Sequence, residues 1–312
     1  MHERLPATVG GLRRLLQALF LLALVAWVLD LAGRLGLAVY TEQYLAFVAG
    51  LAIAMALLAP PAAPRGTAAE LANLGFAVLI LAAFSRAAVL YPELERQLAS
   101  APAPAVLQAV VMIIGVVEAV RRRTGWFLPV LLGGLAFVAL VVGPELPSNL
   151  ATRPVSVERL AVYLALDTNA LLSRLLHVAA VTIAPFILFG VLLNGFGLGL
   201  VLTRRMAQVV GGAKGGMAKA SVLGSAGFGL VSGSAVANVT TVGAVSIPLM
   251  RRAGYQPHEA AAIESVASTG GQLLPPLMGA AAFLMAEFLE LPYRQVAIAA
   301  IVPGLLFYAA LF

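Results

Sequence analysis

Oxygen-bearing side chains gather in one segment of a chain that is otherwise rich in Leu, Ala and Val. Residues 227–243 read GFGLVSGSAVANVTTVG and contain no charged residue. Hydroxyl and amide oxygens are hard ligands, which suit Na⁺-like ions as they suit other hard cations. Gly233, within this segment, permits backbone dihedrals that other residues avoid. The possible ligands are Ser232, Ser234, Asn238, Thr240 and Thr241.

A second polar cluster follows at residues 268–276, which read STGGQLLPP. Proline removes a backbone donor and clashes with the preceding helical turn, and the residue before a proline avoids helical dihedrals. Glycines and prolines this close together predict a broken helix rather than a mild kink.

The composition places both clusters in a membrane protein. Hydrophobic residues make up 61% of the chain and charged residues 11%, whereas a soluble domain has about 25% charged residues. The net charge of +6 fits an excess of Lys and Arg on the cytoplasmic side of a membrane and requires no nucleic-acid partner. The absence of cysteine excludes disulfides and cysteine-based metal or redox sites. The sequence has no Ser/His/Asp set, HExxH motif or P-loop, so we predict no enzyme activity.

The apolar runs predict transmembrane helices. About 20 apolar residues cross the hydrocarbon core, and a helix satisfies its own backbone there. We therefore expect an all-α polytopic membrane protein, built as a bundle of transmembrane helices. The predicted spans are residues 15–35, 44–58, 71–90, 104–120, 126–142 and 177–200, with a last span at 296–312.

The charges predict the orientation of these helices. Basic residues precede the first span and follow the second, fourth and sixth, whereas the opposite loops carry most of the acids. This distribution obeys the positive-inside rule with a cytoplasmic N-terminus. The basic residues are Arg4, Arg13, Arg14, Arg65, Arg121, Arg122, Arg123, Arg204, Arg205, Lys214 and Lys219.

The first polar cluster lies between two basic flanks, at Lys219 and Arg251, which we expect to be cytoplasmic. The residues between them are too few for two full crossings at about 1.5 Å per residue. They suit a re-entrant hairpin at about residues 218–250, and the second cluster then breaks a crossing helix at about residues 257–289. Carbonyls freed at such a break suit a cation, and the N-terminal end of a half-helix suits an anion.

The glycines of the hairpin allow a second interpretation, because small residues also let helices pack closely. Taken alone, the hairpin leaves both interpretations open. A hairpin tip followed at once by a broken helix is typical of the binding site of a secondary transporter, which favours the binding role. The glycines concerned are Gly224, Gly227, Gly229 and Gly233.

The charge pattern divides the chain into two blocks. Residues 1–123 form a four-helix membrane domain that ends in a run of three arginines. Residues 124–312 hold a linking span, an interfacial helix at 157–166, the sixth span, the hairpin, the broken helix and the last span. The interfacial assignment rests on apolar residues at near-helical spacing, with Glu158 and Arg159 on the other side.

Three charged residues in or beside the spans allow structural explanations. Glu264, in the broken helix, is a functional candidate by default, but a place near the cytoplasmic surface would leave it solvated; both interpretations stay open. Arg86 is expected to extend its charge to the outer headgroups rather than to contact a substrate. Glu118 has helical spacing to Arg121 and Arg122, which predicts a surface ion pair.

The segment 170–312 resembles the fused permeases of tripartite ATP-independent periplasmic (TRAP) transporters, in which a four-helix small subunit is joined to a twelve-helix large subunit. The motifs are GGAKGGMAKASVLGSAGFGLV, SGSAVANVTTVGAVSIPLM and STGGQLLPPLMG. Residues 1–123 resemble the small subunit in plan only. The resemblance implies an elevator-type transporter built as an inverted repeat, of which this chain is expected to be the N-terminal half.

The resemblance also implies a function. It implies a Na⁺-coupled symporter that imports organic acids (carboxylates) across the cytoplasmic (inner) membrane of a bacterium or archaeon, with Na⁺ as coupling ion and no other cofactor. It implies a soluble extracytoplasmic substrate-binding protein, of the TAXI type, as partner. The alternative is a non-transporting membrane scaffold or assembly protein, a truncated half permease.

The family builds its ion and substrate site at the hairpin tip and the broken-helix loop. In this chain that site would be partial, with Na⁺ expected at Ser234 and Thr269. The matching residues are Ser232, Gly233, Ser234, Ala235, Asn238, Ser268, Thr269, Gly270 and Gly271.

Overall fold

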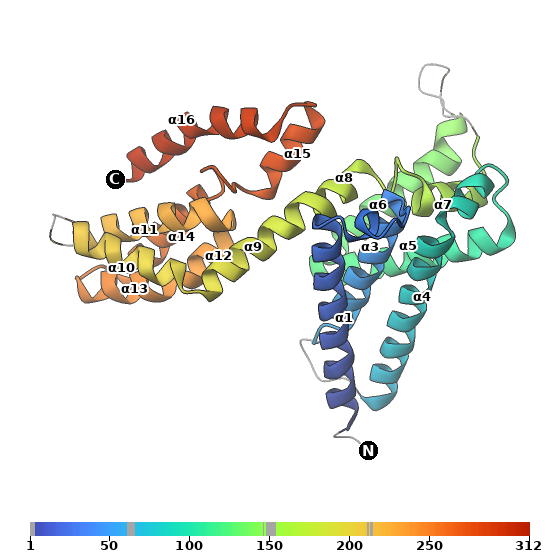
Figure 1. Ribbon diagram of the computed structural model, residues 1–312, viewed down its shortest axis with the longest axis horizontal. Helices are drawn as coiled ribbons and strands as arrows, with labels where there is room; N and C mark the ends of the chain where they lie inside the picture. The colour runs from blue at the N-terminus through green and yellow to red at the C-terminus, as the bar shows by residue number, and fades with distance from the viewer. Residues whose placement is uncertain (1–3, 61–65, 146, 148–153, 211, 213–214) are drawn as a thin grey trace. The chain divides into compact units, whose positions relative to one another are not determined.

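Helices account for all the regular secondary structure in the part of the chain that the structure describes (Figure 1). This computed structural model describes residues 4–60, 66–145, 147, 154–210, 212 and 215–312. Lipid offers no hydrogen-bond partners to backbone N–H and C=O groups, so a sequence this apolar is expected to form helices, which satisfy these groups internally. The prediction of an all-α polytopic membrane protein is confirmed. Of the basic residues used for the orientation, Arg65 and Lys214 lie outside the described residues.

Five helices are long and apolar enough to cross a membrane, counting only the described residues. Each coincides with a predicted span, and two shorter apolar helices coincide with the second and fifth predicted spans. The five are Val9–Val28, Thr67–Arg96, Ala103–Thr124, Arg174–Leu193 and Tyr293–Leu311; the shorter two are Thr41–Leu57 and Phe127–Val142.

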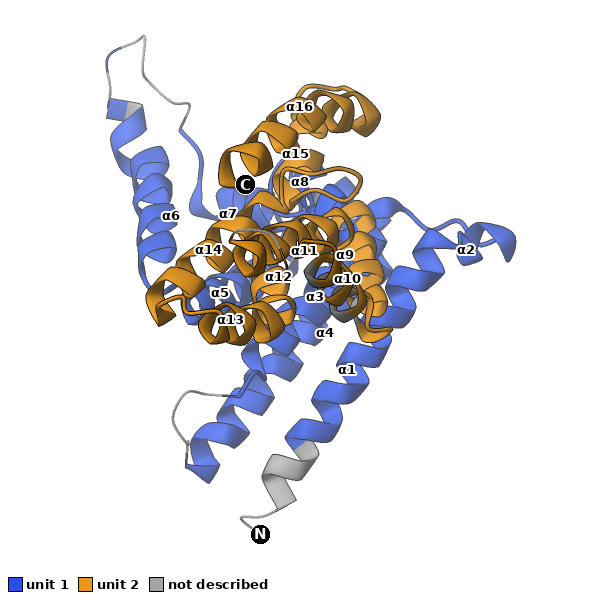
Figure 2. Cartoon of the chain, turned by 90° about the vertical axis from the view of Figure 1, so that its left-hand side faces the viewer, with its two compact units in different colours: residues 1–180 blue, residues 181–312 orange. Residues whose placement is uncertain are grey.

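The chain divides into two compact units, residues 1–180 and residues 181–312 (Figure 2). The predicted division at residue 123 came from the charge pattern and stays a prediction. In order, the α-helices of the first unit are α1 (Arg4–Val28), α2 (Leu31–Arg34), α3 (Thr41–Leu57), α4 (Thr67–Gln97), α5 (Ala103–Thr124), α6 (Phe127–Phe137), α7 (Val157–Leu166) and α8 (Arg174–His177). A π-helix (Val138–Val142) and a 3₁₀-helix (Gly143–Glu145) continue α6.

Small residues let the helices of the first unit pack closely. A Cβ added to Gly50 of α3 would lie 2.5 Å from the Cβ of Phe84 on α4, and one added to Gly115 of α5 would lie 2.7 Å from Ile80. Phe84 and Ile80 are fully buried. This is the packing expected where dispersion rather than hydrophobic transfer holds helices together.

Two predicted boundaries in the first unit were wrong. The first span was expected to reach residue 35, but α1 ends at Val28 because Asp30 takes a left-handed conformation with φ of 49°. The third was expected to end at residue 90, but α4 continues to Gln97 past a kink at Leu90. Helix α7 covers the same residues as the predicted interfacial helix.

The second unit carries the hairpin and the broken helix. Its helices are α9 (Ala184–Gly195), α10 (Leu198–Val210), α11 (Gly216–Ser232), α12 (Ala235–Thr241), α13 (Gly243–Arg252), α14 (Pro257–Gly270), α15 (Ala280–Phe288) and α16 (Tyr293–Leu311). A π-helix, Val178–Ile183, precedes α9. The sixth span was expected to run to residue 200, but α9 ends at Gly195, and a turn with Gly197 at φ of 81° separates it from α10. Helix α10 then packs along α11 (Figure 1).

The hairpin consists of α11, a tip, and the returning pair α12 and α13. Helix α14 packs against all three. Its irregular continuation, residues 271–279, separates it from α15. Both helix breaks therefore fall where the glycines and prolines predicted them.

Candidate functional site

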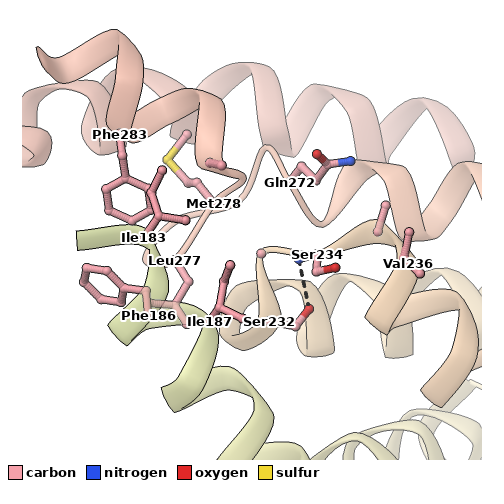
Figure 3. Close-up of a pocket in the computed structure, with 13 residues that line it drawn as sticks. Ile183, Phe186, Ile187, Ser232, Ser234, Val236, Gln272, Leu277, Met278 and Phe283 are labelled. Carbon is pink, nitrogen blue, oxygen red and sulfur yellow. Dashed lines mark hydrogen bonds between the residues drawn. The ribbon is translucent and has the colours of Figure 1, made fainter. Parts of the chain in front are cut away.

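The tip of the hairpin and the loop of the broken helix line one cavity of about 270 Å³ (Figure 3). The hairpin contributes residues 232–236, and the broken helix contributes Gln272, Leu277, Met278, Ala280 and Phe283. Ile183, Phe186 and Ile187 close the side with apolar groups. The structure thus brings four predicted site residues, 232–235, to one cavity.

Gly233 allows the hairpin to turn at this point. It ends α11 with φ of 58°, in the left-handed region. A Cβ added there would lie 1.9 Å from the backbone oxygen of Met278. Both the dihedral and the approach of the second loop therefore require glycine.

The two tip serines are engaged by the local backbone. The Ser234 hydroxyl caps α12 by accepting from the Ala237 N–H at 3.3 Å, a role that serine commonly fills. The Ser232 hydroxyl accepts from the Ser234 N–H at 3.4 Å (Figure 3). These contacts fix the shape of the tip and hold both hydroxyls at the cavity wall.

Asn238, one turn into α12, is fully buried. Its Nδ2 donates to the Ser225 carbonyl on α11 at 2.8 Å. Because only the NH₂ group can donate to a carbonyl, this contact fixes which way the amide points. The Oδ1 atom then has no hydrogen-bond partner among the described residues. A buried acceptor without a donor costs about 1–3 kcal/mol, so this oxygen is available to a hydrogen-bond donor or a cation.

Asn238 lies beside the break in the other helix. A Cβ added to Gly271 would come within 3.0 Å of the Asn238 Nδ2 and 2.9 Å of the Gly229 Cα. The ends of α11 and α14 therefore meet at the amide nitrogen of Asn238, on the side chain whose oxygen is unpartnered. The C-terminal ends of helices carry partial negative charge, so both favour a cation.

Glu264 of α14 is also fully buried, which excludes its solvated interpretation. Four serine hydroxyls donate to its carboxylate. Those of Ser225 and Ser268 reach Oε1 at 2.8 and 2.9 Å, and those of Ser221 and Ser246 reach Oε2. We call these five residues the Glu264 cluster; it joins α11, α13 and α14.

Sequence reasoning missed three of the four serines. Ser268 was predicted as a site residue and is instead engaged by Glu264. A signal existed, because Ser221 and Ser225 are spaced as neighbours on one helix face, as are Glu264 and Ser268. Nothing in the sequence indicated that the two faces meet.

The remaining predicted residues lie elsewhere around the break. The Thr269 hydroxyl donates back to the Ser265 carbonyl at 2.9 Å. Thr269 lines a second cavity, of about 720 Å³, between α15, α16 and the loop, whereas Ser234 lines the tip cavity. Gly270 faces Phe307 of α16, whose ring lies 2.3 Å from where its Cβ would be.

The other charged candidates take structural roles in the first unit. Glu118 pairs with Arg121 at 2.6 Å and with Arg122 at 2.7 Å, so the predicted ion pair is confirmed. Arg86 donates to the buried side chain of Gln108. Across the described part of the chain, no group of three or more His, Cys, Asp or Glu residues could hold a metal ion.

Comparison with curated proteins identifies relatives of this chain by sequence. The C4-dicarboxylate TRAP transporter large permease protein DctM of Pseudomonas aeruginosa is 35% identical over 130 residues, which are 42% of this chain and 30% of that protein. The isethionate TRAP transporter permease protein DctMQ of Oleidesulfovibrio alaskensis is 32% identical over 151 residues, 48% of this chain and 24% of that protein. The 2,3-diketo-L-gulonate TRAP transporter large permease protein YiaN of Escherichia coli is 29% identical over 126 residues, 40% of this chain and 29% of that protein.

The chain thus covers less than a third of each of these relatives. No solved structure matches it. The model of the family "Tripartite ATP-independent periplasmic transporter, DctM component" matches residues 110–312, which include the hairpin, the broken helix and both cavities. This chain therefore belongs to the DctM family of TRAP transporter permeases, a family of transporters rather than enzymes, and it is a multi-pass inner-membrane protein.

Proposed function

We propose that this chain forms part of a permease that imports organic acids by Na⁺ symport. The observation that carries the proposal is the buried, unpartnered Oδ1 of Asn238, on a side chain whose Nδ2 lies where two helix breaks meet. A Na⁺ ion at this oxygen would satisfy it and neutralise the negative ends of α11 and α14. The remaining ligands would be backbone carbonyls freed at the breaks and, at the tip, the Ser234 hydroxyl.

Such a site couples the two loops. The cation would contact the hairpin and the broken helix at the same time. Its binding would therefore stabilise the arrangement in which both loops line the tip cavity. A ligand shifts a conformational equilibrium only by its difference in affinity for the two states. Na⁺ that binds between the loops would have different affinities for the states in which the loops are together and apart. Through this difference, the Na⁺ gradient would drive uptake. The Thr269 hydroxyl, expected as a second Na⁺ ligand, keeps its lone pairs while it donates to the Ser265 carbonyl, but it lines the second cavity rather than the tip cavity.

The substrate class is taken from chemistry that the relatives share. Their names specify C4-dicarboxylate, isethionate and 2,3-diketo-L-gulonate, which are all small organic anions. We expect a small carboxylate to bind in the tip cavity near Gln272 and the tip serines, beside the Na⁺ that offsets its charge. The partner would be an extracytoplasmic substrate-binding protein, of the TAXI type. The N-terminus would be cytoplasmic, and transport would follow an elevator motion.

Uptake by the complete permease tests the proposal. The permease that contains this chain is reconstituted in liposomes with its binding protein and given radiolabelled C4-dicarboxylate, isethionate or sugar acid. We expect uptake of one of these classes that requires an inward Na⁺ gradient. Asn238→Leu, which keeps the volume and removes the oxygen, should abolish it. Gln17→Leu, the same change from amide to leucine at an exposed position of α1, is the matched control and should transport normally.

The alternative, a membrane scaffold without transport, makes the opposite prediction. It expects no Na⁺-dependent uptake of any of the three classes, and no effect of Asn238→Leu beyond stability. The close packing of Gly229 against Gly271 is the observation that favours it. That packing accounts for one glycine pair and leaves the buried Asn238 oxygen unexplained.

A further inference from the structure

The Glu264 cluster holds a carboxylate in the interior of a membrane protein without a basic partner. No salt bridge to Glu264 is present among the residues that the structure describes. All five members of the cluster are buried, and Glu264, Ser225 and Ser268 are fully so. Ionisable groups at such positions are costly and tend to serve a function.

Helix packing alone does not require the charge. Three of the hydroxyls, those of Ser221, Ser225 and Ser246, tie α11 and α13 to α14 through hydrogen bonds that a neutral amide could also make in part. Burying an ion usually costs more stability than burying a neutral group of the same shape. A carboxylate at this position therefore points to an electrostatic role rather than to a purely structural one.

The cluster is connected to the Asn238 side chain, at its amide nitrogen, through one residue. Ser225 donates its hydroxyl to Glu264 at 2.8 Å, and its carbonyl accepts from Asn238 at 2.8 Å. Ser268, which also donates to Glu264, lies in the last turn of α14 before the break. The Glu264 carboxylate is thus linked to Asn238 through Ser225 and to the last turn of α14 through Ser268.

We propose that Glu264 supplies the counter-charge for a monovalent cation bound at Asn238, and that it positions the hairpin against the broken helix. This rests on the proposed function, since it assumes the Na⁺ at Asn238. Charges interact strongly across a protein interior because the effective dielectric constant there is low and salt does not screen them. Glu264 would attract the cation without being its ligand, because its own oxygens are occupied by the four hydroxyls.

The test measures Na⁺ affinity without a substrate. The unfolding temperature of the purified permease that contains this chain is followed in detergent while NaCl replaces choline chloride at constant ionic strength. A ligand that binds the folded state raises this temperature as it saturates the site. Glu264→Gln keeps the side-chain shape and removes the charge, and we expect it to raise the half-saturating Na⁺ concentration about tenfold or more.

Two variants separate charge from packing. Glu259→Gln is the matched control, because Glu259 lies on the same helix, is exposed, and caps it through the Gln256 N–H at 2.9 Å. Glutamine also serves in a capping box, so the half-saturating concentration should stay within about twofold. Ser246→Ala removes one donor and keeps the charge. It should lower the unfolding temperature in choline and leave Na⁺ affinity within about twofold.

Glu264→Asp keeps the proposal testable if Glu264→Gln does not fold. It retains the charge and loses a methylene, so we expect lower stability with Na⁺ affinity within about threefold of the unsubstituted chain. An Asp variant that loses Na⁺ affinity about tenfold, or a Gln variant that loses none, overturns the inference and leaves the proposed function standing. Absence of any Na⁺ response in the unsubstituted permease overturns the cation site itself.

Discussion

Gly229 of α11 and Gly271 of the broken-helix loop touch backbone to backbone. A Cβ on Gly229 would lie 2.4 Å from the Gly271 Cα. Since the contact is with backbone rather than with a flexible side chain, it cannot relax locally. The hairpin and the broken helix are therefore held at one distance, and Asn238 lies beside this crossing.

Gly229→Ala should destabilise the protein for this reason. We expect a loss of about 1–3 kcal/mol in the free energy of unfolding, the usual cost of overpacking. Gly227→Ala, two residues away, is the control, because its Cβ would meet Leu202 at an ordinary 3.7 Å. Replacing a helical glycine by alanine there should gain about 0.5–1 kcal/mol. Chemical denaturation of both variants in detergent measures the difference; equal stabilities would refute the tight crossing.

Gly233→Ala should be more damaging than a comparable change elsewhere. Its positive φ costs an alanine about 1–2 kcal/mol, and the clash with the Met278 oxygen adds to this cost. Gly254→Ala isolates the first contribution, since Gly254 has φ of 98° and open space around it. The drop in unfolding temperature should be clearly larger for Gly233→Ala. Similar drops would mean that the tip can move away from Met278.

Ser221→Ala should expose the strength of the Glu264 cluster. Hydrogen bonds to charged groups contribute about 1.5–3 kcal/mol, and this variant removes one of four. Ser265→Ala, on the exposed face of the same α14 that carries Glu264, should change stability by less than about 0.5 kcal/mol. In a double-mutant cycle, Ser221→Ala combined with Glu264→Gln should be non-additive, because the two residues are in contact. Additive effects would contradict the hydrogen bond.

Water should reach the tip cavity. The chain contains no cysteine, so a single introduced thiol reports without background. Val236→Cys, at a cavity-lining position that is 76% exposed, should react with a membrane-impermeant maleimide, and Na⁺ should slow the reaction. Val222→Cys on the same hairpin is 3% exposed and should stay unreacted. Equal labelling of the two positions, or labelling that Na⁺ does not affect, would count against an ion site at the tip.

Local chemistry made much of this fold predictable. Runs of apolar residues placed the spans, since each segment must bury its own backbone in lipid whatever its neighbours do. Glycine and proline placed both helix breaks, because their effect on dihedrals acts within a few residues. The predicted helix ends were wrong near Val28 and Gly195. At each place one residue in the left-handed region, Asp30 or Gly197, follows the end of a helix whose apolar sequence predicted a longer span.

Contacts between helices decided the rest. The sequence by itself determined that Asn238, Ser268 and Glu264 lie near helix breaks inside a membrane protein. Only the tertiary structure decided that Glu264 accepts hydrogen bonds from serines of α11 and α13 as well as of α14. It also decided that the Asn238 amide donates through its nitrogen to Ser225 and leaves its oxygen unpartnered. Such pairings depend on the rotation and spacing of packed helices. Those are set by many small contacts at once, such as the crossing of Gly229 and Gly271, and no short stretch of sequence specifies them.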